Sequence, residues 1–241
     1  MRVGLYASCL ADLLRPGVAM AALELLEAAG CEVVVPEQSC CGQPAYNGGE
    51  RALARRLAIQ AIERFEDCDY VVLPSGSCAG MMRRHYGALL AGGDLAPGRV
   101  DAFAAKVHEL ADFLVTVLDY RPAARLAATA SYHDGCAGLR ELGVKAQPRA
   151  LLAQVEGLEL REMAEAEQCC GFGGSFAAKY PEISCAIADK KCAALAATGA
   201  DTLIAGDLGC LLHLEGRLRA RGDKRTRLVH FAEVLTGRAE R

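Results

Sequence analysis

Two pairs of adjacent cysteines, each followed by glycine, constrain this chain more than any other feature: Cys40-Cys41-Gly42 and Cys169-Cys170-Gly171. A disulfide needs Cα atoms about 4.4–6.8 Å apart, whereas neighbouring Cα atoms are only about 3.8 Å apart. Adjacent thiols therefore seldom bridge each other, but they can bind one metal cluster together. Glycine lets backbone N–H groups approach the sulfurs of such a cluster.

Each pair belongs to a longer repeat. In the first half, 30 residues separate Cys9 from the pair and 35 residues separate Gly42 from Cys78. In the second half, 32 residues separate Cys136 from the pair and 38 separate Gly171 from Cys210. Each half thus supplies four thiols, which suit a [4Fe–4S] cluster or an all-thiolate zinc site. The predicted ligands are Cys9, Cys40, Cys41, Cys78, Cys136, Cys169, Cys170 and Cys210.

The redox state of the thiols follows from the rest of the sequence. The chain has 12 cysteines, begins with a strand-like segment rather than a signal peptide, and has no apolar run of membrane-spanning length. We therefore expect a cytoplasmic protein with reduced thiols and no membrane span, in which regularly spaced cysteines bind metal. A net charge of −3 gives no reason to expect a nucleic-acid partner.

Strands alternate with helices along the whole chain, which predicts an α/β fold with mainly parallel sheets. We expect two pseudo-symmetric lobes, 1–121 and 122–241, each a small sheet flanked by helices. In such sheets, ligands bind beyond the carboxyl ends of the strands, where the cysteine loops are expected. The predicted strands are 2–6, 31–35, 70–73, 127–132, 158–161, 202–205 and 227–230. Loops are predicted at 37–49 and 92–98, and helices at 17–29, 50–66, 79–90, up to 118, 147–155, 181–198 and up to 220.

The duplicated cysteine pattern resembles the cysteine-rich CCG family. That family includes the cysteine-rich subunit of heterodisulfide reductase and the iron–sulfur subunits of glycolate- and glycerol-3-phosphate-oxidising complexes. The segments 40–49, 74–78, 169–176 and 210–212 are most similar to the branch involved in lactate utilization. The resemblance extends from Val3 to Leu235. It implies an iron–sulfur electron-transfer subunit of a multi-subunit complex that oxidises L-lactate to pyruvate, with partner subunits that carry further iron–sulfur motifs.

The chain departs from the heterodisulfide reductase branch at one point. There each repeat ends in Cys-x-x-Cys, whereas here Met81 and His213 occupy the last position. The resemblance therefore does not extend to clusters held by five cysteines. One or two ordinary [4Fe–4S] clusters are expected, and zinc is possible in one lobe.

Other functions remain open at this level. The chain is alternatively a zinc-binding scaffold that docks a catalytic partner, or the corresponding subunit of a glycolate-, glycerol-3-phosphate- or heterodisulfide-converting complex. A thiol–disulfide enzyme acting through Cys169 and Cys170 is the least favoured alternative. The segment Gly171–Gly174 lacks the order of a dinucleotide-binding motif. The sequence identifies no residues that oxidise lactate.

Several remaining residues have a structural and a functional interpretation. His133 and Asp134 either move protons or cap a loop, and His213 is either a ligand or a surface residue. We expect His108 and His230, at matching places in the repeat, to form structural hydrogen bonds. A solvated helix surface is expected for Arg83, Arg84 and His85, and packing for Met81. The cysteines outside the repeat are expected to be small buried hydrophobic residues: Cys31, Cys68, Cys185 and Cys192.

Overall fold

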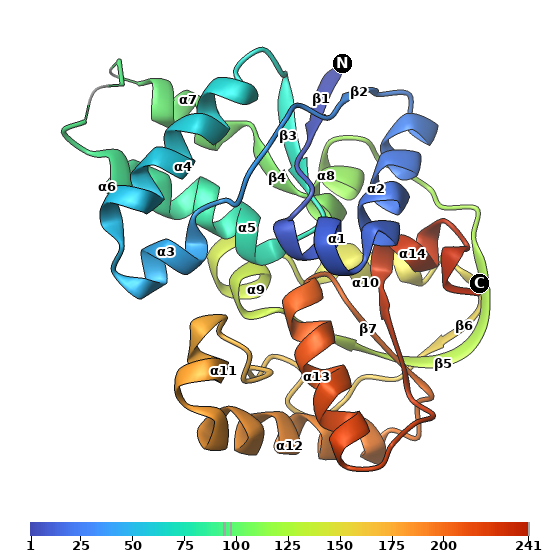
Figure 1. Cartoon of the computed structure of the whole chain (residues 1–241). Helices are drawn as coiled ribbons and strands as arrows, with labels where there is room; N and C mark the ends of the chain where they lie inside the picture. Colours follow the sequence, from blue (N-terminus) through green and yellow to red (C-terminus); the bar gives the residue numbers. More distant parts are fainter. Residues whose placement is uncertain (94, 97, 241) are drawn as a thin grey trace.

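The computed structural model describes residues 1–93, 95–96 and 98–240 and contains two four-stranded sheets (Figure 1). Residues 94 and 97, in the predicted loop 92–98, and residue 241 lie outside the described part. The first sheet comprises β1 (Arg2–Leu5), β2 (Glu32–Val34), β3 (Tyr70–Leu73) and β4 (Val107–Glu109). The second comprises β5 (Arg125–His133), β6 (Glu156–Leu160), β7 (Thr202–Ala205) and β8 (Arg227–His230).

The two sheets have the same topology. The strand order is β2-β1-β3-β4 in the first sheet and β6-β5-β7-β8 in the second, and every pair is parallel. Leu5 lies opposite Val72 in one sheet, as Tyr132 lies opposite Ile204 in the other. This register makes Tyr6 the counterpart of His133 and Ser75 the counterpart of Asp207. The predicted two-lobed α/β fold is confirmed, whereas the boundary between residues 121 and 122 stays a prediction.

Helices surround both sheets (Figure 1). The helices of the first lobe are α1 (Cys9–Leu14), α2 (Pro16–Ala28), α3 (Gln43–Gly48), α4 (Arg51–Arg64), α5 (Gly76–Gly80), the π-helix η1 (Met81–His85), α6 (Tyr86–Leu90), α7 (Arg99–Ala105) and α8 (Leu110–Thr116). The helices of the second lobe are α9 (Cys136–Leu142), α10 (Ala146–Leu152), α11 (Ser175–Lys179), α12 (Pro181–Ala197), α13 (Leu208–Ala220), α14 (Phe231–Leu235) and the 3₁₀ helix η2 (Arg238–Glu240).

All seven predicted strands are present, with bounds that shift by a few residues at most. Three predictions were wrong. The helix expected up to residue 118 is interrupted by β4, the loop expected at 37–49 contains α3, and the helix expected at 79–90 contains a π-helical turn. Local pattern alone missed β4 because it is only three residues long and lies between two helices.

Strands β4 and β8 each lead directly into a helix through a capping side chain. Glu109 accepts hydrogen bonds from the backbone N–H groups of Ala111 and Asp112, and His230 accepts one from Ala232. Glu109 lies opposite Leu73, and His230 lies opposite Ala205 in the same register. Glu109, not His108, is therefore the counterpart of His230, which corrects the predicted match. The predicted structural hydrogen bonds are confirmed, because His108 bonds Asp112 at 3.0 Å and His230 caps α14.

The lobes pack against each other through equivalent pairs of helices. Contacts between α1 and α13 correspond to those between α9 and α5, and contacts between α2 and α14 correspond to those between α10 and α8. Helices α3 and α11, which are counterparts, contact each other. This is the contact pattern of a two-fold axis, as in a symmetric dimer.

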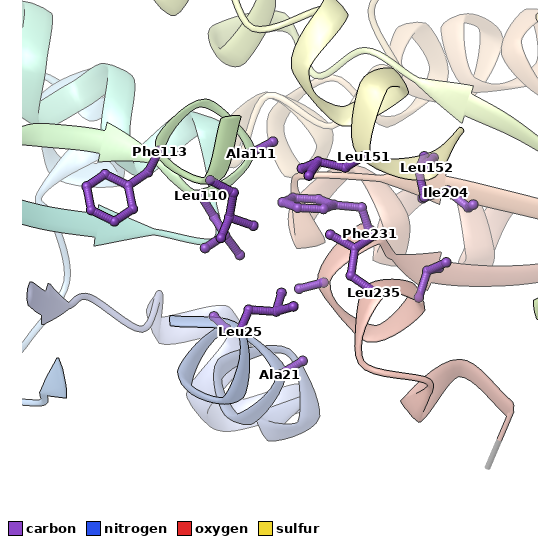
Figure 2. Packing of buried hydrophobic residues seen from close by; sticks show 14 of the residues in the cluster. Ala21, Leu25, Leu110, Ala111, Phe113, Leu151, Leu152, Ile204, Phe231 and Leu235 are labelled. Atoms are coloured by element: carbon purple, nitrogen blue, oxygen red, sulfur yellow. The ribbon is translucent and has the colours of Figure 1, made fainter. Parts of the chain in front are cut away.

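One buried core crosses the lobe interface. Figure 2 shows side chains of α2, α8, α10 and α14 converging, among them Leu25, Leu110, Leu151 and Phe231. Each of these four side chains is at most 1% exposed. Burying a large apolar side chain stabilises a fold by about 1.5–3 kcal/mol. The two lobes therefore stabilise each other through this shared core, in addition to a core within the first lobe and another that lies mainly in the second.

Helices α5 and α9 meet at two glycines. A Cβ atom on Gly76 would lie 2.9 Å from the Cα atom of Gly138, a distance that real Cβ contacts essentially never show. Glycine at this position therefore allows the two backbones to touch. Because Cys78 lies two residues after Gly76 and Cys136 two residues before Gly138, this contact brings cysteines of both lobes together.

We predict that Gly76→Ala lowers the free energy of unfolding by about 1–3 kcal/mol, the usual cost of overpacking. Gly138→Ala is the matched control, since its Cβ would lie 3.8 Å from the nearest atom, Gly76 Cα, at an ordinary contact distance. Urea unfolding followed by circular dichroism measures both. Equal effects of the two substitutions would contradict the close contact.

Candidate metal centre

The eight cysteines of the repeat line a single cavity of about 450 Å³ between the lobes. We predicted two thiol groups at the carboxyl edges of two sheets, and the pseudo-two-fold arrangement turns these edges toward each other. In each lobe two thiols are buried and two are half-buried, in the same order along the repeat. The buried ones are Cys41, Cys78, Cys170 and Cys210, and the half-buried ones are Cys9, Cys40, Cys136 and Cys169.

Helix N-termini hold half of these thiols. Cys9 and Cys136 are the first residues of α1 and α9, and Cys78 and Cys210 are the third residues of α5 and α13. The partial positive charge of a helix N-terminus favours the thiolate, which is the form that binds metal. Three of these helices, α1, α5 and α13, are capped by Ser8, Ser75 and Asp207, whose side chains accept bonds from backbone N–H groups.

The adjacent pairs lie in the loops that follow β2 and β6. The glycine after each pair has a positive φ, +86° at Gly42 and +92° at Gly171. At Gly171 a Cβ atom would lie 2.5 Å from the carbonyl oxygen of Ser184 in α12. Only glycine fits here, because both the backbone conformation and the contact with α12 exclude a side chain.

Neighbouring thiols within each lobe share protons. Hydrogen bonds from the thiols of Cys41 and Cys9 lower the pKa of Cys40 to about 3. In the second lobe, hydrogen bonds from Cys136 and Cys170 lower the pKa of Cys169 to about 2. The same bonds raise the pKa values of the donating thiols above their usual range: Cys9, Cys41, Cys136 and Cys170. One thiolate per lobe forms readily, whereas full ionisation of a group requires a cation at its centre.

The two groups differ in the hydrogen bonds that reach their sulfurs. In the first lobe Gly42 N–H donates to Cys40 Sγ at 3.4 Å. In the second lobe Gly171 N–H donates to Cys169 Sγ at 3.3 Å and Phe172 N–H donates to Cys170 Sγ at 3.5 Å. Each such bond stabilises negative charge on sulfur. The second site therefore has the larger number of described backbone donors.

Asp207 joins the two sites. Its side chain caps α13 by accepting from Gly209 N–H at 3.1 Å. Its other oxygen accepts from Ser77 N–H at 3.0 Å and from the Ser75 hydroxyl at 3.3 Å, both in the first lobe. One carboxylate therefore caps the helix of Cys210 and contacts the helix of Cys78. We did not identify Asp207 from the sequence, although its place three residues before Cys210 matches that of the capping residue Ser75.

His133 lies close to the second thiol group, at the end of β5. A ring nitrogen of His133 and the Sγ atoms of Cys170 and Cys210 all lie within 4.8 Å of one another. Among the described residues, neither group of four thiols contains three members that meet this criterion. His133 makes no hydrogen bond through either ring nitrogen, so the predicted capping role was wrong.

The carboxylate of Asp134 pairs with Arg149, at 2.8 and 2.9 Å. Asp134 is completely buried, while Arg149 is 19% exposed and also binds Glu162. The pair fixes the segment between β5 and Cys136. Neither residue of this pair lines the cavity.

Other predicted residues have structural roles. Met81 is fully buried in the core, as predicted. His213 Nε2 lies 3.2 Å from the Ser184 hydroxyl, and His213 is not in the tight ligand set. Arg83, Arg84 and His85 contact the protein itself: they bind the Val107 carbonyl, the Glu141 carbonyl and the Glu141 carboxylate. The expected solvated surface is therefore only partly present.

Three of the four cysteines outside the repeat behave as predicted. Cys31, Cys68 and Cys192 are buried in the hydrophobic cores. Cys185 is only half-buried and belongs to none of these cores, so the prediction of a buried hydrophobic residue was wrong for it.

Comparison with known proteins places the chain in a family. The family model described as the CCG cysteine-rich domain matches residues 3–83 and 130–215, which contain all eight cavity cysteines. The chain belongs to the CCG cysteine-rich domain family. The two matched segments correspond to the two repeats and contain six of the eight strands or parts of them.

Curated relatives match the chain along nearly its whole length. Lactate utilization protein A of an Exiguobacterium species is 44% identical over 237 residues, 97% of this chain and 96% of the relative. Lactate utilization protein A 2 of Bacillus cereus is 42% identical over 239 residues, 98% of each chain. Lactate utilization protein A of Halalkalibacterium halodurans is 44% identical over 237 residues, 98% of this chain and 96% of the relative.

A solved structure shares the CCG fold. The crystal structure of a hypothetical protein from Helicobacter pylori superposes with a TM-score of 0.70 and 12% identity, covering 100% of this chain and 49% of that one. This likeness supports the architecture alone. In the described part of this CCG protein, no helix has the length and apolar character that crossing a membrane requires.

We predict that Arg149→Ala destabilises the protein by roughly 3–5 kcal/mol, because it leaves the buried Asp134 carboxylate unpaired. Arg161→Ala is the control, since Arg161 pairs with Glu159 on the surface, where such pairs contribute about 0–1 kcal/mol. Chemical denaturation of the metal-free protein measures both changes. A loss no greater for Arg149→Ala than for Arg161→Ala would show that the buried pair is dispensable.

Proposed function

We propose that the protein is an iron–sulfur electron-transfer subunit of a multi-subunit complex that oxidises L-lactate to pyruvate. The observation that carries this proposal is the convergence of two four-thiol groups on one cavity. The lactate assignment is supported by relatives named for lactate utilization, which match at 42–44% identity over nearly the whole chain. The eight cavity cysteines are the proposed ligands.

The arrangement of the thiols suits a cluster of several metal ions. Around a single tetrahedral zinc ion, ligand sulfurs lie about 3.8 Å apart, given a Zn–S distance of about 2.3 Å. In neither lobe do three of the four thiols lie within 4.8 Å of one another among the described residues. No three thiols of one group therefore have the mutual spacing that a single tetrahedral ion needs, and we propose one [4Fe–4S] cluster in each.

The residues around the thiols suit this occupant. A bound iron–sulfur cluster supplies one-electron redox chemistry. The N–H groups of Gly42, Gly171 and Phe172 are directed at ligand sulfurs, where they stabilise negative charge and raise the reduction potential. Burial of Cys41 and Cys170 keeps water from one side of each site.

The remaining steps of lactate oxidation belong, in this proposal, to partner subunits with further iron–sulfur motifs. No residue of this chain is assigned to the oxidation of lactate itself. We place the protein in the cytoplasm, where thiols stay reduced and available for metal.

Zinc is the second candidate, and one observation favours it in the second lobe. His133, Cys170 and Cys210 form the one tight ligand set among the described residues. Zinc has no redox chemistry, so a zinc-loaded second lobe would act as a scaffold that docks a catalytic partner.

Metal analysis after anaerobic purification tests the proposal. We expect a brown protein with about four iron atoms per loaded site, whose visible absorption is bleached by dithionite. Addition of lactate to the complete complex should bleach it in the same way. A colourless protein that holds only zinc after anaerobic reconstitution would refute the electron-transfer role. Bleaching by glycolate or glycerol 3-phosphate but not by lactate would assign the subunit to a complex that oxidises that substrate instead.

We also predict that the second site keeps its iron longer in air, because more backbone N–H groups reach its sulfurs. In aerobically prepared protein, Cys41→Ser should leave the remaining iron nearly unchanged, whereas Cys170→Ser should remove most of it. Anaerobically, each substitution should remove about half of the iron. If the first site kept its iron longer in air than the second, the described N–H···S bonds would not determine how long a site retains iron.

A further inference from the structure

His133 is a buried side chain without a partner. It is 0% exposed, and neither ring nitrogen forms a hydrogen bond. A buried polar group left without a partner costs about 1–3 kcal/mol. Such a group therefore requires an explanation, and an unseen ligand is one.

Two charged groups in the surroundings of His133 are already engaged. The Lys191 ammonium donates to the carbonyl oxygens of Glu165 and Ala166 at 2.7 and 3.0 Å. The next residue, Asp134, has both oxygens bound by Arg149. What remains beside the ring are the thiols of Cys170 and Cys210, within 4.8 Å. The imidazole therefore lies beside two thiols that line the cavity, although His133 itself does not line it.

The first lobe lacks an equivalent. Tyr6, the counterpart of His133, donates its hydroxyl to the carbonyl oxygen of Ser39. A tyrosine whose hydroxyl is engaged in this way offers no free nitrogen or sulfur donor. Each lobe therefore has four thiols. Only the second lobe has a fifth free donor group, the imidazole of His133.

We propose that His133 is a metal ligand, so that the second lobe binds its metal through an imidazole together with the thiolates of Cys170 and Cys210. The first lobe binds through thiolates alone. The metals that suit a mixed nitrogen and sulfur set are zinc and iron. For zinc, bonds of about 2.0–2.1 Å to nitrogen and 2.3 Å to sulfur place these atoms about 3.6 Å apart, which is compatible with atoms that lie within 4.8 Å of one another. This inference rests on the proposed function only in requiring a metal in the second lobe.

X-ray absorption at the zinc edge tests the assignment. Metal-free protein carrying Cys40→Ser and Cys41→Ser, which disable the first site, is loaded with one equivalent of Zn²⁺ alone. We expect a first shell of sulfur and nitrogen, together with the outer-shell scattering of an imidazole ring. His133→Leu in the same background should abolish the imidazole signal and weaken Zn²⁺ binding at least about tenfold.

Two controls identify the imidazole and the lobe. His213→Leu removes the other histidine near the second site and should leave the imidazole signal intact. The converse variant, Cys169→Ser with Cys170→Ser, disables the second site and leaves Zn²⁺ in the first. Its spectrum should show no imidazole signal, with or without Tyr6→Phe.

The inference is overturned if the second site shows sulfur ligands without imidazole, or if the imidazole signal survives His133→Leu. The first of these measurements needs no change at His133, so it stands even if His133→Leu does not fold. Because Zn²⁺ alone is the probe, failure of this inference is distinct from failure of the iron–sulfur proposal, which depends on iron content and bleaching.

Discussion

Mutual repulsion among thiolates is the constraint on which the rest of this structure depends. Each lobe places four sulfurs close enough to share protons, and the lowered pKa of Cys40 or Cys169 is obtained only by raising those of its neighbours. A cation at the centre of each group relieves this repulsion, and metal binding then releases the remaining protons. The helix N-termini and N–H···S bonds act in the same direction, since both favour negative charge on sulfur.

The fold brings the thiols to this arrangement with few specialised residues. Parallel strands deliver the cysteine loops to one edge of each sheet, and equivalent helix contacts set the two edges face to face. Gly76 allows α5 and α9 to touch, and Asp207 ties α13 to α5. The geometry of each site therefore depends on residues of both lobes.

The sequence was sufficient to predict the two lobes, seven of the eight strands and the eight cavity cysteines, because spacing and alternation are local patterns. It was insufficient for the shared cavity, since strand order does not determine how two sheets face each other. The segment Val107–Glu109 was predicted as helix, although its likeness to Val229 and His230, which lie within the predicted strand 227–230, was a usable signal. The sequence could not show that the His133 side chain lacks a hydrogen-bond partner, because this depends on the residues that surround it in the folded protein.

The pseudo-two-fold axis has a consequence for how the two sites differ. A dimer of identical lobes with this interface would present the same residue at both equivalent positions, so a histidine in one site would appear in the other. Here the two halves are joined in one chain, and Tyr6 and His133 occupy equivalent places with different chemistry. Covalent fusion thus keeps the packing advantages of symmetry while freeing each half to specialise.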